Sequence, residues 1–259
     1  MTMAAIEGLL LDIDGVLTVS WDPIPGAVDA MKRLREQVPF RLITNTTTHT
    51  RRDLAETLRG AGFDVSPDEI VTAVTATAAY LREHHPGGRA FVLTDGAPGE
   101  DLAGVPIAES PQDADAIVIG GASDAFTYDV LNDIFRRLMD GAALVGMHRN
   151  LYWRTARGWE LDGGAYIAGL EAAANTTATI CGKPAAAYFE AALDLLGVPA
   201  ARAAMVGDDI TNDVEGARAA GLTGVLVRTG KFREEDLAKG SPDSVLGSIA
   251  DVPDWLAQR

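Results

Sequence analysis

The sequence is poor in cysteine, in basic residues and in long apolar runs. Its 259 residues include one cysteine, Cys181, so no disulfide can form within the chain, which fits a reducing cytosol. The 22 basic side chains face 37 acidic ones, and the net charge of −15 argues against binding to nucleic acid or to anionic membranes. No apolar run approaches the ~18 residues that span a bilayer, and no basic segment opens the chain. We therefore expect a soluble, cytoplasmic protein.

Length and apolar content favour a folded chain with more than one part. Apolar residues make up 47% of the sequence, which is enough to bury a sizeable core and excludes global disorder. At ~150 residues per domain, a chain of 259 residues predicts one large domain or a domain with an insert.

Short apolar runs alternate with amphipathic segments, and this alternation predicts an α/β fold with a parallel sheet. The expected strands are residues 6–11, 40–43, 90–93, 116–119, 143–145, 203–206 and 225–227. The expected helices are 25–37 with Pro25 in the first turn, one over 54–61, one opened by a capping box at Ser66, 127–139, 163–174, and one behind Pro184.

The strands and helices fall into three stretches, of which the third resumes the pattern of the first. This order predicts an α/β core made of residues 1–80 and 180–259, interrupted by a roughly central α/β insert of residues 81–179. These boundaries are expected to hold within about 6 residues.

Polar residues follow the expected strands at four places in the core. The segments are 11–17, 43–46, 182–184 and 207–213. In open parallel sheets, ligands bind at the carboxyl ends of the strands. Each segment alone says little, but the four together predict a binding site at this edge of the sheet.

Five carboxylates would crowd at this edge, namely Asp12, Asp14, Asp208, Asp209 and Asp213. At ~4 Å and an effective dielectric of ~20, each like-charged pair costs roughly 4 kcal/mol. Such a cluster persists only if a cation neutralises it, and oxygen ligands select a hard ion such as Mg²⁺. Because Mg²⁺ keeps several waters and also binds substrate phosphate, we expect an incomplete protein cage around it.

With these segments in this order, the chain resembles the haloacid dehalogenase (HAD) superfamily of phosphatases over its whole length. The insert between the Thr44 and Lys183 segments resembles that of the NagD-like class, which has a large α/β cap. The run 227–232 is similar to one in the phospholysine, phosphohistidine and inorganic pyrophosphate phosphatase group. The resemblance implies a Rossmann-like parallel-sheet core, a smaller inserted α/β cap domain and phosphoester hydrolysis.

The resemblance gives the chemistry to the first two acids. Asp12 would be the nucleophile, which attacks phosphorus in line and forms an aspartyl-phosphate. Asp14 would protonate the leaving oxygen and then act as the base for the hydrolytic water. Relatives that cleave carbon–halogen bonds or pump ions lack an acid at the position of Asp14, so its presence favours phosphoester hydrolysis.

The next two segments would bind the phosphoryl group. Thr44 and the Asn45 amide would donate hydrogen bonds to phosphoryl oxygens. Lys183 would pair with Asp12 and stabilise the transferring group.

The resemblance also implies the ligands of the metal. Mg²⁺ would bind Asp12, Asp208 and the main-chain carbonyl of Asp14. Asp213, and with it Asp209, would act through water or by holding these ligands in place.

Each of these assignments has a structural alternative. Four of the residues could serve ordinary turns at strand ends: Asp12, Asp14, Thr44 and Asn45. Lys183 could be a solvated loop lysine, and Asp209 could be an acid at a helix N-terminus. Cys181 has no evident activating partner, so we interpret it as a buried strand residue rather than a nucleophile.

The insert would select the substrate. In capped members of the superfamily it covers the active site and excludes water. Candidate contacts are His148–Trp153 and Gly163–Tyr166, which could equally be structural, with Trp153 and Trp159 filling the core of the insert. A large cap blocks folded protein surfaces, so we expect a small phosphorylated metabolite. Phosphoamides and pyrophosphate are expected as candidate substrates on the resemblance alone.

Three functions remain open. A Mg²⁺-dependent phosphatase is favoured because nucleophile, acid/base, lysine and metal-binding acid are all present. A phosphotransferase or mutase would pass the aspartyl phosphate to a sugar, and a catalytically inactive ligand-binding homologue would keep only the fold. Similar proteins often form homodimers through their caps, so a homodimer is an open alternative for this chain.

Overall fold

The structure is a computed structural model and describes residues 5–155 and 158–259. Within these residues the chain divides into two compact units. The first unit contains the residues up to Thr44, Arg51–Val71 and Lys183–Arg259, and the second contains Asn45–Thr50 and Thr72–Gly182.

The first unit is built on a six-stranded sheet in which β1, one of the inner strands, ends at Asp12. The sheet order is β14-β13-β12-β1-β4-β5, and β1 pairs in parallel with both β12 and β4. Its strands are β1 (Gly8–Asp12), β4 (Phe40–Thr44), β5 (Ile70–Thr72), β12 (Ala203–Gly207), β13 (Thr223–Val227) and β14 (Ser244–Leu246). All residues of β1 are buried, as expected for a strand in the middle of a parallel sheet.

Helices cover this sheet and fix the position of its strands. They are α1 (Ala27–Gln37), α2 (Arg51–Gly60), α6 (Ala186–Leu196), α7 (Gly216–Ala219) and α8 (Val252–Leu256), with a π-helical segment, η6 (Ile210–Glu215). Short 3-10 turns are η1 (Pro67–Glu69), η5 (Ala200–Arg202), η7 (Glu234–Ala238) and η8 (Ile249–Asp251), and a small hairpin joins β2 (Thr18–Val19) to β3 (Asp22–Pro23). One apolar core contains Leu9 and Leu11 of β1 together with the buried faces of α1, α2 and α8.

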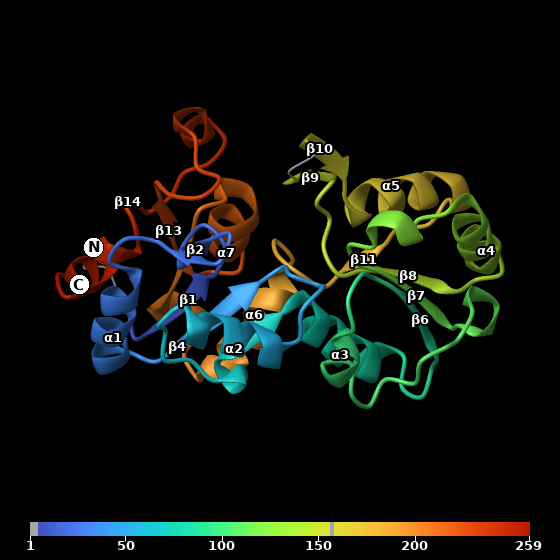
Figure 1. Cartoon of the computed structure of the whole chain (residues 1–259), viewed down its shortest axis with the longest axis horizontal. Helices are drawn as coiled ribbons and strands as arrows, with labels where there is room; N and C mark the ends of the chain where they lie inside the picture. Colours follow the sequence, from blue (N-terminus) through green and yellow to red (C-terminus); the bar gives the residue numbers. More distant parts are fainter. Residues whose placement is uncertain (1–4, 156–157) are drawn as a thin grey trace. The chain divides into compact units, whose positions relative to one another are not determined.

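The second unit holds a smaller parallel sheet with helices on both faces (Figure 1). Its order is β11-β8-β7-β6, with strands β6 (Ala90–Leu93), β7 (Ala116–Ile119), β8 (Ala143–Gly146) and β11 (Thr179–Ile180). One core joins this sheet to α4 (Tyr128–Met139) and α5 (Gly163–Ala174), and another joins it to α3 (Ala73–His84). The remaining elements are η2 (Pro98–Glu100), η3 (Pro111–Asp113), η4 (Ser123–Ala125), β9 (Tyr152–Thr155) and β10 (Gly158–Leu161). Because α3 packs on the second sheet, the first unit's second segment ends at Val71, earlier than the expected residue 80.

The chain before α3 differs from the prediction. Ser66 does form a capping box, but it opens only the 3-10 turn η1, and the chain then enters β5. Ile70 and Val71 are β-branched and buried, which favours a strand over a helix. The helix begins at Ala73 instead, with Thr72 as its N-cap.

The start of α1 also differs from the prediction. Pro25 lies before the helix rather than in its first turn. Gly26 takes the N-cap position with φ of 81°, a left-handed value that glycine adopts without steric cost, so the helix begins at Ala27.

The predicted fold class is confirmed as α/β with a parallel-sheet core. Strands 90–93 and 116–119 and helix 163–174 have the predicted bounds. In the described part of the chain, no helix is both long and apolar enough to cross a membrane.

Candidate active site

The register of the first sheet gathers several of the predicted residues. Asp12 pairs with Ile43 of β4 on one side, and Leu11 pairs with Val206 of β12 on the other. Parallel strands end at a common edge, so Thr44, the last residue of β4, and Asp208, which follows β12, lie at the same edge as the end of β1.

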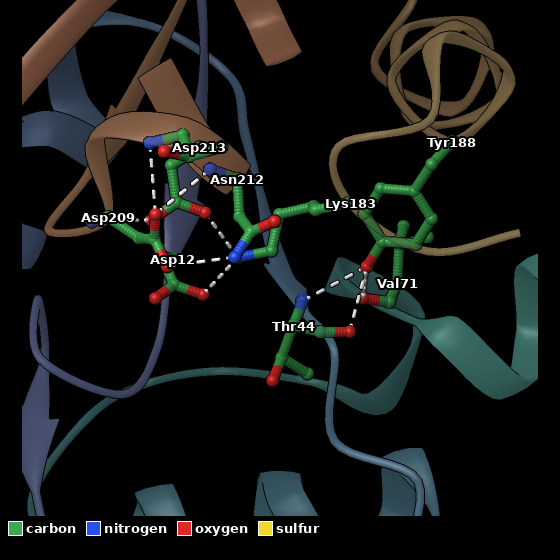
Figure 2. Close-up of polar contacts among 9 residues, drawn as sticks. Asp12, Thr44, Val71, Lys183, Tyr188, Asp209, Asn212 and Asp213 are labelled. Atoms are coloured by element: carbon green, nitrogen blue, oxygen red, sulfur yellow. Dashed lines mark hydrogen bonds and ion pairs between the residues drawn. The ribbon is translucent and has the colours of Figure 1, made fainter. Parts of the chain in front are cut away.

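Lys183 lies among the acids of this edge (Figure 2). Its side chain is 4% exposed, and its Nζ lies 2.6 Å from Asp12 Oδ1 and 2.6 Å from Asp213 Oδ1. Burial by itself would lower the pKa of Lys183, but the charges of Asp12 and Asp213 outweigh it and raise the pKa above its usual value. Lys183 is therefore a buried, charged ammonium and not a solvated loop lysine.

Asp12, Asp208 and Asp213 form a buried carboxylate cluster, each offering an oxygen within 4.8 Å of the others. Burial, and then the charges of Asp12 and Asp213, raise the pKa of Asp208 to about 8. Burial also raises the pKa of Asp213, to about 6, although the neighbouring Lys183 ammonium counteracts it. Without a further cation, burial and mutual repulsion therefore oppose full ionisation of the cluster.

The donor set of this cluster fits a hard divalent cation. Asp208 Oδ2 accepts a hydrogen bond from the Lys231 amide at 2.6 Å, whereas its buried Oδ1 has no hydrogen-bond partner among the described residues. A buried carboxylate oxygen without a partner is costly unless a cation or a water reaches it. When all three carboxylates are ionised, the buried ammonium of Lys183 offsets one charge and leaves two, which a divalent cation with oxygen ligands would balance.

Asp209 and Asp213 differ in what their side chains do. The Asp213 carboxylate pairs with Lys183 and accepts a hydrogen bond from the Asp209 amide at 3.1 Å. The Asp209 side chain instead caps η6, accepting hydrogen bonds from the amides of Thr211 and Asn212 at 3.0 and 2.9 Å. Asp209 thus has the capping role that the sequence left open, and it touches the cluster through its main chain.

A buried tyrosine, Tyr188, holds the end of β4. Its hydroxyl accepts a hydrogen bond from Thr44 N at 3.1 Å and lies 2.9 and 2.8 Å from the carbonyls of Thr44 and Val71 (Figure 2). Burial raises the pKa of Tyr188 above its usual range, so the hydroxyl keeps the proton that it donates. These bonds fix the Thr44 main chain where the strand ends.

Asp14 and Asn45 lie in different units. Asp14 is exposed, two residues beyond Asp12, and is followed by Gly15 with φ of 91°. Asn45 begins the segment that belongs to the second unit, where its side chain lies against Gly182. The chain therefore makes one of its crossings from the first unit to the second between Thr44 and Asn45.

The candidate contacts of the insert all belong to the second unit. His148 is buried, with its Nε2 3.7 Å from Asp162 Oδ1, and Arg149 pairs with Glu171. Leu151 and Tyr152 are exposed, whereas the side chains of Trp153 and Trp159 lie outside what the structure describes.

The segment Gly163–Tyr166 forms the first turn of α5. A Cβ on Gly163 would overlap the Gly120 carbonyl, and one on Gly164 would press on the carbonyls of Arg149 and Asn150. These glycines thus have a packing role.

Cys181 is buried, and burial raises the pKa of its thiol to about 11. The thiolate that nucleophilic chemistry needs is therefore scarce at neutral pH, in line with the sequence interpretation.

Sequence reasoning missed three residues that touch this site. Tyr188 was hidden in the apolar pattern of its helix, and Thr229 and Lys231 belong to the run 227–232, to which the sequence assigned no role. Lys231 is exposed as a whole. Partial desolvation lowers the pKa of its ammonium, but the charges of Asp208, Asp12 and Asp213 outweigh it and raise the pKa.

Comparisons with known protein families agree with this geometry. A family model for haloacid dehalogenase-like hydrolases matches residues 9–107, and a HAD-hydrolase-like model matches residues 180–252. Human haloacid dehalogenase-like hydrolase domain-containing protein 2 is 39% identical over 243 residues, which cover 93% of this chain and 92% of the relative. Human phospholysine phosphohistidine inorganic pyrophosphate phosphatase is 33% identical over 266 residues, covering 99% and 96%.

Solved structures resemble the whole chain. The p-nitrophenyl phosphatase from Archaeoglobus fulgidus superposes with a TM-score of 0.90 at 30% identity, covering 97% of this chain and 99% of that one. NagD from E. coli K-12 gives a TM-score of 0.85 at 27% identity, covering 95% and 98%. These matches confirm the resemblance to HAD enzymes of the NagD-like class.

Proposed function

This chain belongs to the haloacid dehalogenase-like hydrolase family and is a phosphatase, and on that premise we propose that it hydrolyses a small phosphorylated metabolite through an aspartyl-phosphate on Asp12, with Mg²⁺ as its cation. The observation that carries this proposal is the buried Lys183 ammonium placed 2.6 Å from Asp12 inside a cluster of carboxylates. A nucleophilic carboxylate needs this combination of neighbours, because it must be oriented and must meet a negatively charged phosphoryl group.

In the first step, a carboxylate oxygen of Asp12 attacks phosphorus. The new Asp12–phosphorus bond forms as the bond to the leaving oxygen breaks. Lys183 holds Asp12 Oδ1 and offsets negative charge as the phosphoryl group approaches. Asp213 keeps Lys183 in place from its other side.

Asp14 would act twice as a proton carrier. Its exposed position, two residues beyond the nucleophile, suits it to reach the leaving oxygen rather than phosphorus. It gives its proton to the leaving oxygen, and then takes a proton from the water that attacks the aspartyl-phosphate. That attack breaks the Asp12–phosphorus bond and releases inorganic phosphate.

The metal would be held by Asp12, Asp208 and the main-chain carbonyl of Asp14. When bound, Mg²⁺ would neutralise the carboxylate cluster and draw the phosphoryl oxygens toward Asp12. The buried Asp208 Oδ1, which has no hydrogen-bond partner among the described residues, supports this assignment.

Thr44 and Asn45 would bind the phosphoryl oxygens. Thr44 is buried at the end of the strand beside β1, and Tyr188 fixes its main chain. Asn45 would contribute its amide from the point where the chain enters the second unit.

The names of the relatives support a choice of substrates. One relative is named for phospholysine, phosphohistidine and inorganic pyrophosphate, and one similar structure for p-nitrophenyl phosphate. We therefore propose that phosphomonoesters, phosphoamides and pyrophosphate are the compounds to test first.

The test is phosphate release from p-nitrophenyl phosphate by wild type and Asp12→Asn, each with Mg²⁺ and with EDTA. We expect turnover by wild type that needs Mg²⁺ and disappears in the variant. Turnover in EDTA, or an active Asp12→Asn protein, would contradict the mechanism. Adding an acceptor sugar separates hydrolysis from phosphotransfer, since a mutase or transferase would yield a phosphorylated sugar in place of free phosphate.

A further inference from the structure

The loop after β13 contacts two separate parts of the site. Thr229 Oγ1 donates a hydrogen bond to the Gly15 carbonyl at 2.5 Å, and the Lys231 amide donates one to Asp208 Oδ2 at 2.6 Å. Gly15 follows Asp14 directly in the turn after β1. One short loop therefore holds both the turn that carries Asp14, directly after β1, and the carboxylate of Asp208.

Two glycines bring these parts together. Gly15 and Gly230 both have positive φ, 91° and 61°. A Cβ on either glycine would overlap Asp208 Oδ2, and a Cβ on Gly230 would also overlap Gly15 Cα. Asp208 Oδ2 is therefore enclosed by two main-chain segments and tied by a hydrogen bond.

This enclosure gives the two oxygens of Asp208 different roles. Oδ2 is bound by the Lys231 amide, and Oδ1 is buried with no hydrogen-bond partner among residues 5–155 and 158–259. Because the two oxygens share one rigid plane, fixing Oδ2 also fixes the direction of Oδ1. The side chain is thus prevented from turning, and Oδ1 keeps one direction.

We propose that Thr229–Lys231 is a positioning loop, which holds Asp208 and the turn after β1 in the arrangement that a divalent cation needs. This inference rests on the proposed metal site and adds residues that supply none of its ligands. Groups that orient metal ligands are commonly worth about 10- to 100-fold in metal affinity. The loop should therefore act on the affinity for the cation while the ligand set stays complete.

The first test measures Mg²⁺ binding by isothermal titration calorimetry for wild type, Gly230→Ala and the control Gly221→Ala. Gly221 also has positive φ, 88°, but a Cβ there meets only Ala200 Cβ, at 3.6 Å. Both variants carry similar backbone strain, and only Gly230→Ala presses on Asp208. We expect Gly230→Ala to raise the Kd for Mg²⁺ at least about tenfold, and Gly221→Ala to leave it within about twofold.

The second test removes one hydrogen bond without adding bulk. Thr229→Val has nearly the same shape but cannot donate to Gly15, Thr229→Ser restores the hydroxyl, and Thr223→Val is the matched control at the other end of β13. We expect Thr229→Val to raise the Kd and the half-saturating Mg²⁺ concentration about fivefold, and Thr229→Ser to restore both. At saturating Mg²⁺, kcat for p-nitrophenyl phosphate should return to within about twofold of wild type, since no ligand is lost.

The outcomes separate the two proposals. If wild type binds Mg²⁺, and the Gly230→Ala and Thr229→Val proteins fold and bind it equally well, the proposed role of the loop is wrong. The proposed metal site is then unaffected. If wild type does not bind Mg²⁺, the proposed metal site fails and the loop's role fails with it. Should Gly230→Ala not fold by circular dichroism, Thr229→Val against Thr229→Ser decides the question alone.

Discussion

The two parallel sheets of this chain differ at their carboxyl edges. In the first unit, three buried carboxylates meet around Lys183 at the end of β1. In the second unit, the described residues hold no comparable group of metal-binding side chains. The ends of its strands β6 and β7 are instead tied to each other by main-chain hydrogen bonds, such as Asp95 N to Gly121 O at 2.6 Å.

This difference separates what the fold supplies from what the residues supply. Both sheets bury their strands between helices, so both could present side chains at the same edge. Among the described residues, only the first sheet has a cluster of carboxylates at the ends of its strands, and Lys183 stabilises this cluster by pairing with two of them. A shared architecture therefore does not give a shared chemistry.

The largest expected effect comes from replacing one acid that follows a strand of each sheet by asparagine. Asp208→Asn should lower kcat for p-nitrophenyl phosphate at least about 100-fold, because it removes a proposed metal ligand. Asp95→Asn, which follows β6 in the second sheet, should cost less than about tenfold. Steady-state assays at saturating Mg²⁺ make the comparison, and equal losses in the two variants would contradict it.

Asp208→Asn should also separate activity from stability. Burial, and then the charges of Asp12 and Asp213, raise the pKa of Asp208, so a neutral asparagine removes the cost of keeping an acid there in the metal-free protein. Thermal unfolding without added metal should therefore occur at or above the wild-type temperature, and Mg²⁺ should no longer raise it. A strongly lowered unfolding temperature would show that Asp208 stabilises the fold rather than binding a cation.

The next effect compares a buried ion pair with a surface one. Lys183→Met leaves three carboxylates without their cation and should lower the free energy of unfolding by about 3–5 kcal/mol. Arg149→Met breaks the pair with Glu171 in the second unit, where the arginine side chain is 40% exposed, and should cost about 1 kcal/mol or less. Urea unfolding measures both, and a Lys183→Met protein as stable as wild type would contradict the buried charge.

A smaller effect is expected at Tyr188. Tyr188→Phe leaves the buried main-chain groups of Thr44 and Val71 short of a partner, which should cost about 1–3 kcal/mol in unfolding free energy. Tyr128→Phe is the control, since Tyr128 is 81% exposed, and should change stability by less than about 0.5 kcal/mol. Unfolding curves that coincide for both variants and wild type would contradict the role of the hydroxyl.

The smallest effect concerns pH, and it sharpens the contrast between acids inside and outside the site. Burial would raise the pKa of Glu171, but hydrogen bonds from Arg149 and the Ala178 amide outweigh it and lower the pKa below its usual 4.5. A lowered pKa stabilises the fold above the unfolded value, and this contribution is lost as pH falls through the folded value. The Tm difference between wild type and Glu171→Gln should therefore be largest near neutral pH and vanish well below pH 4.5. Arg149→Met should give the same profile, and a difference that grows in acid would contradict the assignment.

The sequence was sufficient to predict that Asp12, Asp208 and Asp213 gather at one edge of the sheet, because the information that places them is local. Asp12 and Asp208 each follow an unbroken apolar run, and the order of strands in a parallel sheet then brings such ends to one edge. The role of Lys183 was harder to predict from local sequence. Its assignment depended on the family resemblance, and its position in the site depends on packing.

The missed features depend on contacts between distant segments. Tyr188 bonds to residues 144 and 117 positions away, and Thr229 to one 214 positions away, which no local pattern shows. The capping box at Ser66 failed as a helix signal for a related reason. It describes only the first turn, and the burial of Ile70 and Val71 in the sheet then decides that a strand follows.

The most direct test of the account is to identify the phosphorylated residue. Wild type and Asp14→Asn are mixed with Mg²⁺ and p-nitrophenyl phosphate, quenched in acid within milliseconds, and digested for peptide mass spectrometry. We predict one added phosphoryl group on the peptide that contains Asp12, more abundant in Asp14→Asn because the attacking water lacks its base. Turnover with no phosphoryl group on that peptide in either protein, or with one attached elsewhere, would contradict Asp12 as the nucleophile.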